Sequence, residues 1–472
     1  MIIVPFTRVF AEDFTIKKEI MENSVSDQKN VELLARLNRI PVWALPKSYL
    51  AIIGIGYFFT FYDISNIGFA MPAINEQFHL SNSTSLFLVL SVGLIGYIIG
   101  SFVIGILADR FGRYRMLLLT FALTAIGSFG DALAPGITTL IIFRFITGVG
   151  VGADLNLVST YISELAPTSK RGRITLITFL VGILGQTVTP FVALALVPHF
   201  ETGWRLLFGI GGLIAVVGLL LRVRLPESPR WEVHHGRYED AEKTISLMEK
   251  NCQSRHINLP KASPDQVDFS KGVPLRFLFQ PLYLRRLAIL VPMWFLWYIG
   301  NYGFLGDAAD LISAHGAGIG GSITYLAVGA IGYPIGTLLV LRIVDRLERK
   351  KLIFFTTIVW FIGMLLIAGY ANTLSIYIGS LCASLALGSY LQVAYTYTAE
   401  TFPTQARSTG FALSDGLGHA GGAVGALLLP AIIAHYSFFT GFAFIGCTGL
   451  LAGIIALFGP NTTGRNLESV SS

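Results

Sequence analysis

Charged residues and cysteines are both scarce in this sequence. Only 13% of its 472 residues are charged, 53% are hydrophobic, and the mean hydropathy is +0.65. This composition excludes a soluble multi-domain protein and indicates a polytopic membrane protein. The three cysteines, Cys252, Cys382 and Cys447, are far apart, so neither a disulfide framework nor a cysteine metal site is indicated, and we expect free thiols that mostly pack.

Motifs of catalysis and of ATP use are also missing. The sequence has no G-x-x-x-x-G-K-[ST] phosphate-binding loop, so ATP-driven pumping has no support. No hydrolytic triad and no metal-ligand spacing is visible, and we expect no enzyme, no cofactor and no metal. A net charge of +6 would suggest nucleic acid as a partner in a soluble protein, but in a membrane protein it reports topology, and we expect no nucleic-acid partner.

Long apolar runs are what the sequence has in abundance. Twelve of them approach the ~20 residues that a helix needs to cross a bilayer. They lie near 49–71, 85–107, 115–133, 138–165, 174–197, 205–222, 286–305, 322–344, 352–370, 374–398, 408–432 and 438–459. Such runs are too long for barrel strands, and lipid-exposed irregular backbone does not survive in hydrocarbon. The predicted fold class is therefore an all-α membrane protein with twelve transmembrane helices.

Lysines and arginines are distributed unevenly among the loops. All of the 34 except Arg144, inside the fourth run, and Arg205, at the start of the sixth, fall on the side of the N- and C-terminal segments. The positive-inside rule then places both termini and the long middle loop in the cytoplasm. We expect a multi-pass protein of the plasma membrane, embedded in the lipid bilayer as a monomer.

The middle loop divides the runs into six and six. It carries a soluble helical pattern from Tyr238 onward, punctuated by prolines. The first 48 residues lack the features of a secretory signal, and Met21 is an alternative to Met1 as the start of translation. We therefore expect a cytoplasmic N-terminal segment (1–48), a six-helix bundle (49–222) and a cytoplasmic linker with short helices (223–285). A second six-helix bundle (286–459) and a cytoplasmic tail (460–472) follow.

A charged turn with glycines interrupts the apolar sequence after the second run, and it recurs in the second half. An arginine at the bilayer centre is costly, so we expect the turn at a membrane face. The turn Asp109-Arg110-Phe-Gly112-Arg113 reappears 236 residues later as Asp345-Arg346-Leu-Glu348-Arg349. At the same offset, Tyr161-x-x-Glu164-x-x-Pro167-x-x-x-Arg171 reappears as Tyr397-x-x-Glu400-x-x-Pro403-x-x-x-Arg407. Two motifs at one offset indicate an internal duplication.

These motifs, over about residues 45 to 460, resemble the major facilitator superfamily. Two further motifs, Arg144-x-x-x-Gly148-x-Gly150-x-Gly152 and Pro226-Glu227-Ser228-Pro229-Arg230-Trp231, are similar to the sugar-porter and related metabolite branches. The resemblance implies two pseudo-symmetric six-helix bundles that rock around a central site. In the fifth run Gly185 is followed by Gln186 and not by the proline of the superfamily's antiporter branch, which favours symport over drug efflux.

Opposite charges at neighbouring helix ends predict two cytoplasmic charge clusters. We expect them to latch this face and to release it during alternating access, as the resemblance also implies. The alternative is that they are solvated charges that only set topology. The latch residues are Gly105, Asp109, Arg110, Gly112, Arg113, Glu164 and Arg171 in the first half and Asp345, Arg346, Arg349, Glu400 and Arg407 in the second. Since Glu348 stands where the first copy has Gly112, we expect Asp109 to be less replaceable than Asp345.

Two charges inside the first and fourth runs point to transport chemistry. At 1.5 Å per residue, Asp63 and Arg144 both lie ~9–12 Å below the external surface. Isolated charges there are expensive, so we expect the two side chains to pair. A carboxylate with a breakable partner is suited to taking up a proton, and the resemblance to sugar porters implies a proton-coupling pair at these positions. A permanent structural pair and a water-lined aspartate are the alternatives.

Three further ionisable residues inside the runs are candidates for a role in transport. Asp154, ten residues after Arg144 on the same helix, is a second candidate for proton coupling or substrate binding, and a structural hydrogen-bonded role is the alternative. Asp415 and His419 are four residues apart and share a helix face, so they are candidates for a proton relay. Ordinary packing is the alternative for this histidine.

Polar and aromatic residues near mid-depth predict a substrate site where the two halves meet. The candidate substrate ligands are Gln186, Tyr298, Asn301, Tyr302, Gln392 and Tyr395, with Tyr390 beside them. Gln186 and Asn301 match ligands of the sugar porters, which the chain resembles. Phe295 and Leu296 replace that group's glutamine pair and Tyr395 replaces its tryptophan, which weakens a hexose assignment.

The sequence as a whole predicts a secondary active transporter, namely a proton-coupled symporter of a small polar metabolite that works by alternating access. An organic acid, a sugar and a phosphate-like anion all remain open as substrate. The alternatives are an uncoupled facilitator of the same substrate class and a transporter-like membrane receptor or sensor.

Overall fold

The computed structural model describes residues 28–80, 83–167, 171–263, 279–344, 346–369, 372–402 and 410–463, without the side chains at 83–90, 163 and 171–173. Asp345, Arg407 and the side chain of Arg171, three of the expected latch residues, lie outside this description. So do the first 27 residues and the tail from 464.

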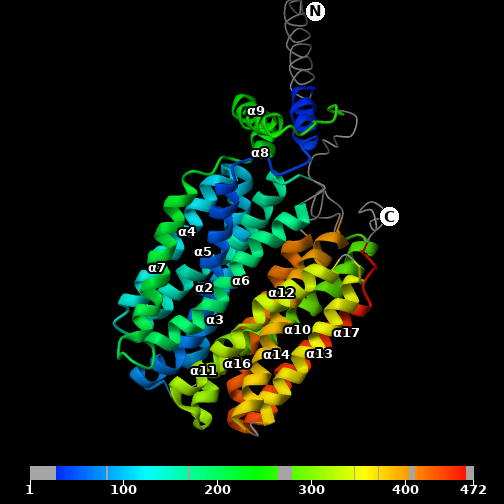
Figure 1. Cartoon of the computed structure of the whole chain (residues 1–472). Helices are drawn as coiled ribbons and strands as arrows, with labels where there is room; N and C mark the ends of the chain where they lie inside the picture. The colour runs from blue at the N-terminus through cyan, green and yellow to red at the C-terminus, as the bar shows by residue number, and fades with distance from the viewer. Residues whose placement is uncertain are drawn as a thin grey trace, which may run out of the picture.

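Six long helices form the first half of the chain. They are α2 (Lys47–Phe78), α3 (Ser83–Phe111), α4 (Arg113–Leu133), α5 (Ile137–Leu165), α6 (Arg171–Leu196) and α7 (Gly203–Arg222). Two short helices follow, α8 (Pro229–His234) and α9 (Tyr238–Ser254). Figure 1 shows α8 and α9 at one end of this half, beyond the ends of the long helices.

The second half repeats the arrangement. Its elements are α10 (Pro281–Ile312), the π-helical turn η4 (Ser313–Ala317), α11 (Gly318–Ala330), α12 (Gly332–Ile343), α13 (Arg349–Gly369), α14 (Thr373–Thr401), the π-helical turn η6 (Ala412–Gly416), α16 (Leu417–His435) and α17 (Phe438–Leu457). In Figure 1 the blue-to-green half and the yellow-to-red half lie side by side.

The apolar helices account for twelve membrane crossings. Eleven segments of the described chain are long and apolar enough to span, and one of them, Pro281–Ile343, is 63 residues long. A straight helix of that length would measure ~95 Å, three times the hydrocarbon thickness. Gly316 and Gly318 have φ of +110° and +65° and turn the chain there. This segment therefore supplies two spans, α10 and the pair α11–α12, and the predicted all-α fold with two six-helix bundles is confirmed.

Two spans extend further than their apolar runs. Helix α2 continues to Phe78, seven residues past the expected end at 71, and α10 runs from Pro281 to Ile312 instead of from 286 to 305. The reason is that backbone hydrogen bonding does not stop where the apolar pattern stops. The extensions meet each other, because the side chain of Asn75 on α2 faces the carboxyl group of Asp310 on α10.

The N-terminal segment packs on the linker helices. Residues 28–38 are helical, and Arg36 binds Glu242 at 2.6 Å and Glu249 at 2.7 Å. Arg39 binds the same Glu249 at 2.6 Å. Leu33, whose side chain is 1% exposed, is buried in the same contact layer. Because this segment is polar in sequence, only the folded chain reveals that it joins α9.

Glycines bring α3 and α5 into backbone contact. A Cβ atom on Gly148 would lie 2.0 Å from the carbonyl oxygen of Gly93, and one on Gly100 would lie 2.1 Å from that of Val149. Small residues are what allow membrane helices to approach this closely. The contact seats the helix that carries Arg144 against the one that lines the interface with the second half.

A single residue, Gly112, joins α3 to α4. Its φ of 103° and ψ of 152° lie in a region that is essentially restricted to glycine. A Cβ there would also lie 2.1 Å from Oε2 of Glu227. A Cβ at Gly105, in contrast, meets nothing within 4 Å. Both glycines belong to the same sequence motif, but only Gly112 is required by the backbone.

We therefore expect Gly112→Ala to destabilise the protein by about 1–3 kcal/mol, the usual range for a strained backbone position. Thermal unfolding of the purified protein measures the loss. Gly105→Ala is the matched control and should unfold like the wild type. Equal unfolding temperatures for Gly112→Ala and the wild type would contradict this account of the turn.

Candidate functional site

Two small cavities lie between the halves, in the centre of the molecule. The first has a volume of about 70 Å³ and is lined by Asp63, Arg144, Tyr97 and Thr147 of the first half and by Tyr302 of the second, with apolar neighbours. The second, of about 20 Å³, is lined by residues that include Gln186, Asn301 and His419. Ile64, Tyr302 and Leu305 line both cavities. Each has room for one or a few water-sized molecules.

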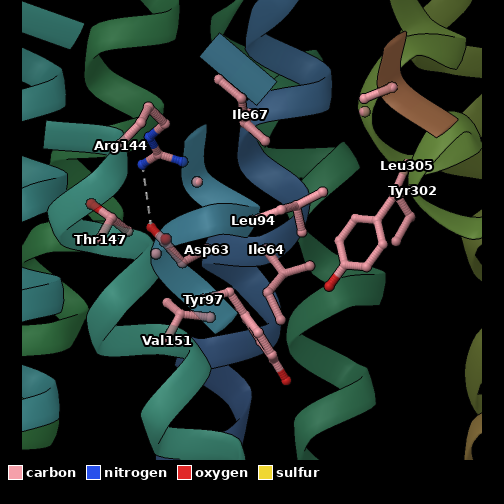
Figure 2. A pocket seen from close by; sticks show the side chains of 14 residues that line it. Asp63, Ile64, Ile67, Leu94, Tyr97, Arg144, Thr147, Val151, Tyr302 and Leu305 are labelled. Carbon is pink, nitrogen blue, oxygen red and sulfur yellow. Dashed lines mark ion pairs between the residues drawn. The ribbon is translucent and has the colours of Figure 1, made fainter. Parts of the chain in front are cut away.

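Asp63 and Arg144 meet at the first cavity, as their positions in the sequence predicted. Nη2 of Arg144 lies 3.9 Å from Oδ1 of Asp63, and both side chains are 5% exposed. The same oxygen accepts hydrogen bonds from Nδ2 of Asn66 and from Oγ of Ser128, each at 3.0 Å. Figure 2 shows the Asp63–Arg144 pair on the wall of the cavity, with Thr147 and Val151 beside it.

The stronger partner of Arg144 is a residue that the sequence analysis missed. Nε of Arg144 donates to Oδ2 of Asp131 at 2.6 Å, and Nη2 donates to the same oxygen. Oγ1 of Thr147 donates to it as well, at 3.3 Å. The ring of Phe208 lies 4.6 Å below the guanidinium. Asp131 is close to the end of the third apolar run, where a charged side chain is ordinarily expected at the membrane surface. In the structure it is fully buried.

Asp154 forms a separate buried pair with Arg222. Nη1 and Nη2 of Arg222 bind the two carboxylate oxygens, and Oγ1 of Thr60 and of Thr120 donate to them at 2.8 and 3.0 Å. The guanidinium also lies 3.8 Å from the ring centre of Phe121. Arg222 was counted with the loop charges in the sequence, because it ends the sixth run. Asp154 lines neither central cavity, and its charge is matched one to one.

Asp415 and His419 come together at the interface of the halves. Oδ1 of Asp415 accepts a hydrogen bond from the hydroxyl of Tyr298 at 2.7 Å. Nδ1–H of His419 donates to the backbone carbonyl of Asp415 at 2.8 Å, since a carbonyl only accepts. The imidazole lies between the rings of Tyr97, 4.1 Å away in the first half, and Tyr298, 4.0 Å away. Asp415 sits in the π-helical turn η6, an irregularity common at functional sites.

Five of the six expected substrate ligands line the second cavity. They are Gln186, Tyr298, Asn301, Tyr302 and Tyr395. The sixth, Gln392, is buried but does not line it. Nε2 of Gln186 and Oδ1 of Asn301 are buried atoms without a hydrogen-bond partner in the described structure. An orphaned donor and an orphaned acceptor on one cavity wall are groups that a ligand can satisfy. Tyr390 stacks on Trp297 at 3.6 Å and serves packing.

The first of the two charge clusters holds helix ends together within the first half. Arg113 pairs with Asp109 at 2.7 Å and with Glu164 at 3.1 Å, and its Nη1 donates to the carbonyl of Ala108 at 2.8 Å. Oε1 of Glu227 accepts the backbone N–H of Arg113 at 2.9 Å and so caps α4. Burial raises the pKa of Glu227, and the backbone N–H groups that it accepts oppose the rise. Arg110 lies on the exposed side of the turn.

The second cluster repeats these bonds with different side chains. Arg349 pairs with Glu400 at 2.9 Å and donates to the carbonyl of Val344, 236 residues after Ala108. Its backbone N–H donates to Oγ1 of Thr463 at 3.1 Å, where Arg113 uses Glu227. Tyr161 donates to the carbonyl of Pro226, and Tyr397 donates to that of Pro460. The duplication thus extends to the hydrogen bonds. Arg346 is exposed, and within the described residues both clusters pair inside their own half.

A model of the family "Sugar (and other) transporter" matches residues 49–472. The chain belongs to this family.

Named relatives of this sugar transporter family member carry different cargoes. It is 29% identical over 452 residues to the niacin transporter NiaP of Acinetobacter baylyi, covering 93% of this chain and 100% of that one. It is 28% identical over 398 residues to a D-xylose transporter of Levilactobacillus brevis, covering 82% and 85%. The family is therefore established, and the cargo is not decided by similarity alone.

Solved structures agree with the fold of this family member. The chain superposes on the xylose transporter XylE from E. coli, in a partially occluded inward-open conformation, with a TM-score of 0.71, 22% identity and coverage of 89% of this chain and 99% of that one. The major facilitator fold that the sequence motifs implied is thereby confirmed.

The Asp154–Arg222 pair makes a direct prediction about stability. Asp154→Asn leaves a buried guanidinium without its counter-charge, which costs about 3–5 kcal/mol. Thermal unfolding of the purified protein should show this loss, whereas Thr60→Val, which removes one neutral hydrogen bond to the same carboxylate, should cost only about 1 kcal/mol. An Asp154→Asn protein that unfolds like the wild type would show that Arg222 does not depend on this partner.

Proposed function

We propose that this protein is a proton-coupled symporter that imports a small organic acid across the plasma membrane by alternating access. The observation that carries the proposal is the Asp63–Arg144 contact on the wall of the central cavity, 3.9 Å long. A carboxylate that faces water on one side and an arginine on the other can exchange a proton when the cavity opens. The family supports transport, and the proton:xylose symporter XylE shares the fold.

The chemistry of the second cavity supports an organic acid with a planar ring over a sugar. Aromatic and aliphatic side chains make up most of its wall, among them Phe61, Tyr298 and Tyr395. Two buried polar atoms of this wall, Nε2 of Gln186 and Oδ1 of Asn301, have no hydrogen-bond partner among the described residues. A carboxylic acid or amide group needs few such partners, and a planar ring can stack on the aromatic side chains of the wall. The niacin transporter NiaP, a relative, is named for a molecule of this kind.

The remaining expected residues take supporting parts in this proposal. The cytoplasmic clusters around Arg113 and Arg349 fasten the helix ends of each half, so that each half moves as a rigid body. His419 stacks on Tyr97 across the interface, and Asp415 lies four residues before it, so the two are positioned to respond to the relative movement of the halves and to pass a proton. We assign Asp154 a structural role, because Arg222 neutralises its charge. Both termini are placed in the cytoplasm with the linker helices.

Proton coupling predicts two effects in proteoliposomes loaded at neutral pH and placed in acidic medium. Nicotinate is the probe, because a relative is named for niacin. A protonophore should abolish uphill uptake, and Asp63→Asn should abolish uphill uptake while it preserves exchange of internal for external substrate. Uphill uptake that persists in Asp63→Asn would refute the coupling role. Uptake that never exceeds equilibrium in the wild type would identify an uncoupled facilitator, and binding without flux would identify a receptor.

The substrate assignment makes its own prediction. Replacing Gln186 or Asn301 by Leu removes a group that pairs with the substrate, and each change should raise KM for nicotinate about tenfold, equivalent to a hydrogen bond of ~1.4 kcal/mol. Gln392→Leu is the matched control, since Gln392 is buried but does not line the cavity. Uptake of xylose but not of nicotinate by the wild type would contradict this assignment and favour a sugar as the substrate.

A further inference from the structure

Asp131 gives Arg144 a second carboxylate, and the charges around Arg144 do not balance. Asp63 comes from α2, Asp131 from α4 and Arg144 from α5. With both carboxylates ionised, this group of three side chains carries a net charge of −1 in a buried site. A buried net charge in a membrane protein is costly, and a single bound proton would remove it. The Asp154–Arg222 pair of the same half needs no proton to be neutral.

The hydrogen bonds indicate which of the two carboxylates stays ionised. Oδ2 of Asp131 receives three donors, two from Arg144 and one from Thr147. Hydrogen bonds to a carboxylate favour its charged form, and those from a guanidinium are the strongest. The donors that reach Asp63 within hydrogen-bond distance are neutral, from Asn66 and Ser128, and both go to Oδ1. Arg144 is therefore bound to Asp131 and only near Asp63.

The two carboxylates also differ in their access to the first cavity. Asp63 lines the first cavity and Asp131 does not (Figure 2). A proton that arrives through the cavity reaches Asp63 first. Asn66 bridges the two groups, because its Nδ2 donates to Asp63 and its Oδ1 accepts from Nη1 of Arg144 at 3.4 Å.

We propose that Asp131 is a positioning residue: it is the permanent counter-ion of Arg144, and it thereby leaves Asp63 free to bind and release one proton in each cycle. The proposal rests on the proposed function, in which protons drive import. The proton adds to the Asp63 carboxylate from the cavity and leaves by the same cavity once it opens to the other side. Arg144 stays neutralised by Asp131 in both forms.

The charged and titratable groups around the three side chains fit this assignment. Helix α3 contributes Tyr97 and α10 contributes Tyr302 to the cavity. Helix α7 contributes Phe208 below Arg144, and Arg205, whose Nη1 donates to the carbonyl oxygens of Ala132 and Ala134 at 3.1 and 2.6 Å. Tyr62 of α2 donates to the carbonyl of Leu207. Within the described residues, these elements bring no second cation to Asp63 or Asp131.

Replacement of Asp131 should change how readily Asp63 binds a proton. In Asp131→Asn, the counter-charge left to Arg144 is Asp63, so the two should form a closed one-to-one pair like that of Asp154 and Arg222. A proton must then compete with the guanidinium, and an opposite charge at contact distance moves such a titration by about one to three pH units.

Infrared difference spectroscopy of the purified full-length protein between acidic and neutral pH tests this without a substrate. The carboxyl stretching band that is lost in Asp63→Asn is the signal of Asp63. In Asp131→Asn the midpoint pH at which this band appears should fall by one unit or more. Asp131→Glu should restore the wild-type midpoint. Thr60→Val, which removes one neutral hydrogen bond to Asp154 and keeps every carboxyl group, is the control for a change elsewhere in the half and should leave the band in place. Monodisperse gel filtration of each variant checks that it folds.

Two results would overturn the assignment. An Asp63 band with an unchanged midpoint in Asp131→Asn would make Asp131 merely structural. Loss of the titrating band in Asp131→Asn, with its persistence in Asp63→Asn, would make Asp131 the proton carrier itself. Failure of the proposed function looks different: the spectra would follow the expected pattern, but uphill uptake by the wild type would be insensitive to a protonophore.

Discussion

A charge inside a membrane protein is tolerable only beside an opposite charge, because the desolvation cost of an isolated ion is several kcal/mol. This constraint organises the first half of the chain. Arg222 draws Asp154, Thr60 and Thr120 into one closed group. Arg144 pairs with Asp131, which also accepts a hydrogen bond from Thr147, and Asp63 lies close to the same guanidinium. The difference between the two groups is the number of carboxylates, and in our proposal it separates a structural pair from a site that binds a proton.

Close helix contacts and helix caps hold each half together. Backbone contact between α3 and α5 at Gly93 and Gly148 fixes the helix that carries Arg144. Glu227 and Thr463 stand at the same 236-residue offset and cap corresponding helices in the two halves, although they differ in chemistry. The duplication has thus preserved the bond from a backbone N–H that a helix end requires and has let the acceptor side chain diverge. Between the rigid halves lie small cavities and a ring stack of Tyr97 on His419, which a rocking movement must separate.

Much of this follows from the sequence, because apolar run length, charge asymmetry and the 236-residue offset each have a direct physical meaning. The contact of Asp63 with Arg144 was predictable from their matching depth. Asp131 and Arg222 were missed because depth along a helix says nothing about the direction in which a side chain points. A charge at the end of an apolar run can face water or turn inward, and only the packing of neighbouring helices decides. The seating of residues 28–38 on α9 was missed for a similar reason, since long-range ion pairs leave no periodic pattern in the sequence.

The central claim is that one carboxylate in excess over Arg144 carries one proton. The most direct test is the ratio of protons to substrate, measured in proteoliposomes as the pH gradient that just balances a known nicotinate gradient. The account predicts one proton for each substrate molecule in the wild type and none in Asp63→Asn. A ratio of two, or a ratio of one that survives in Asp63→Asn, would contradict it.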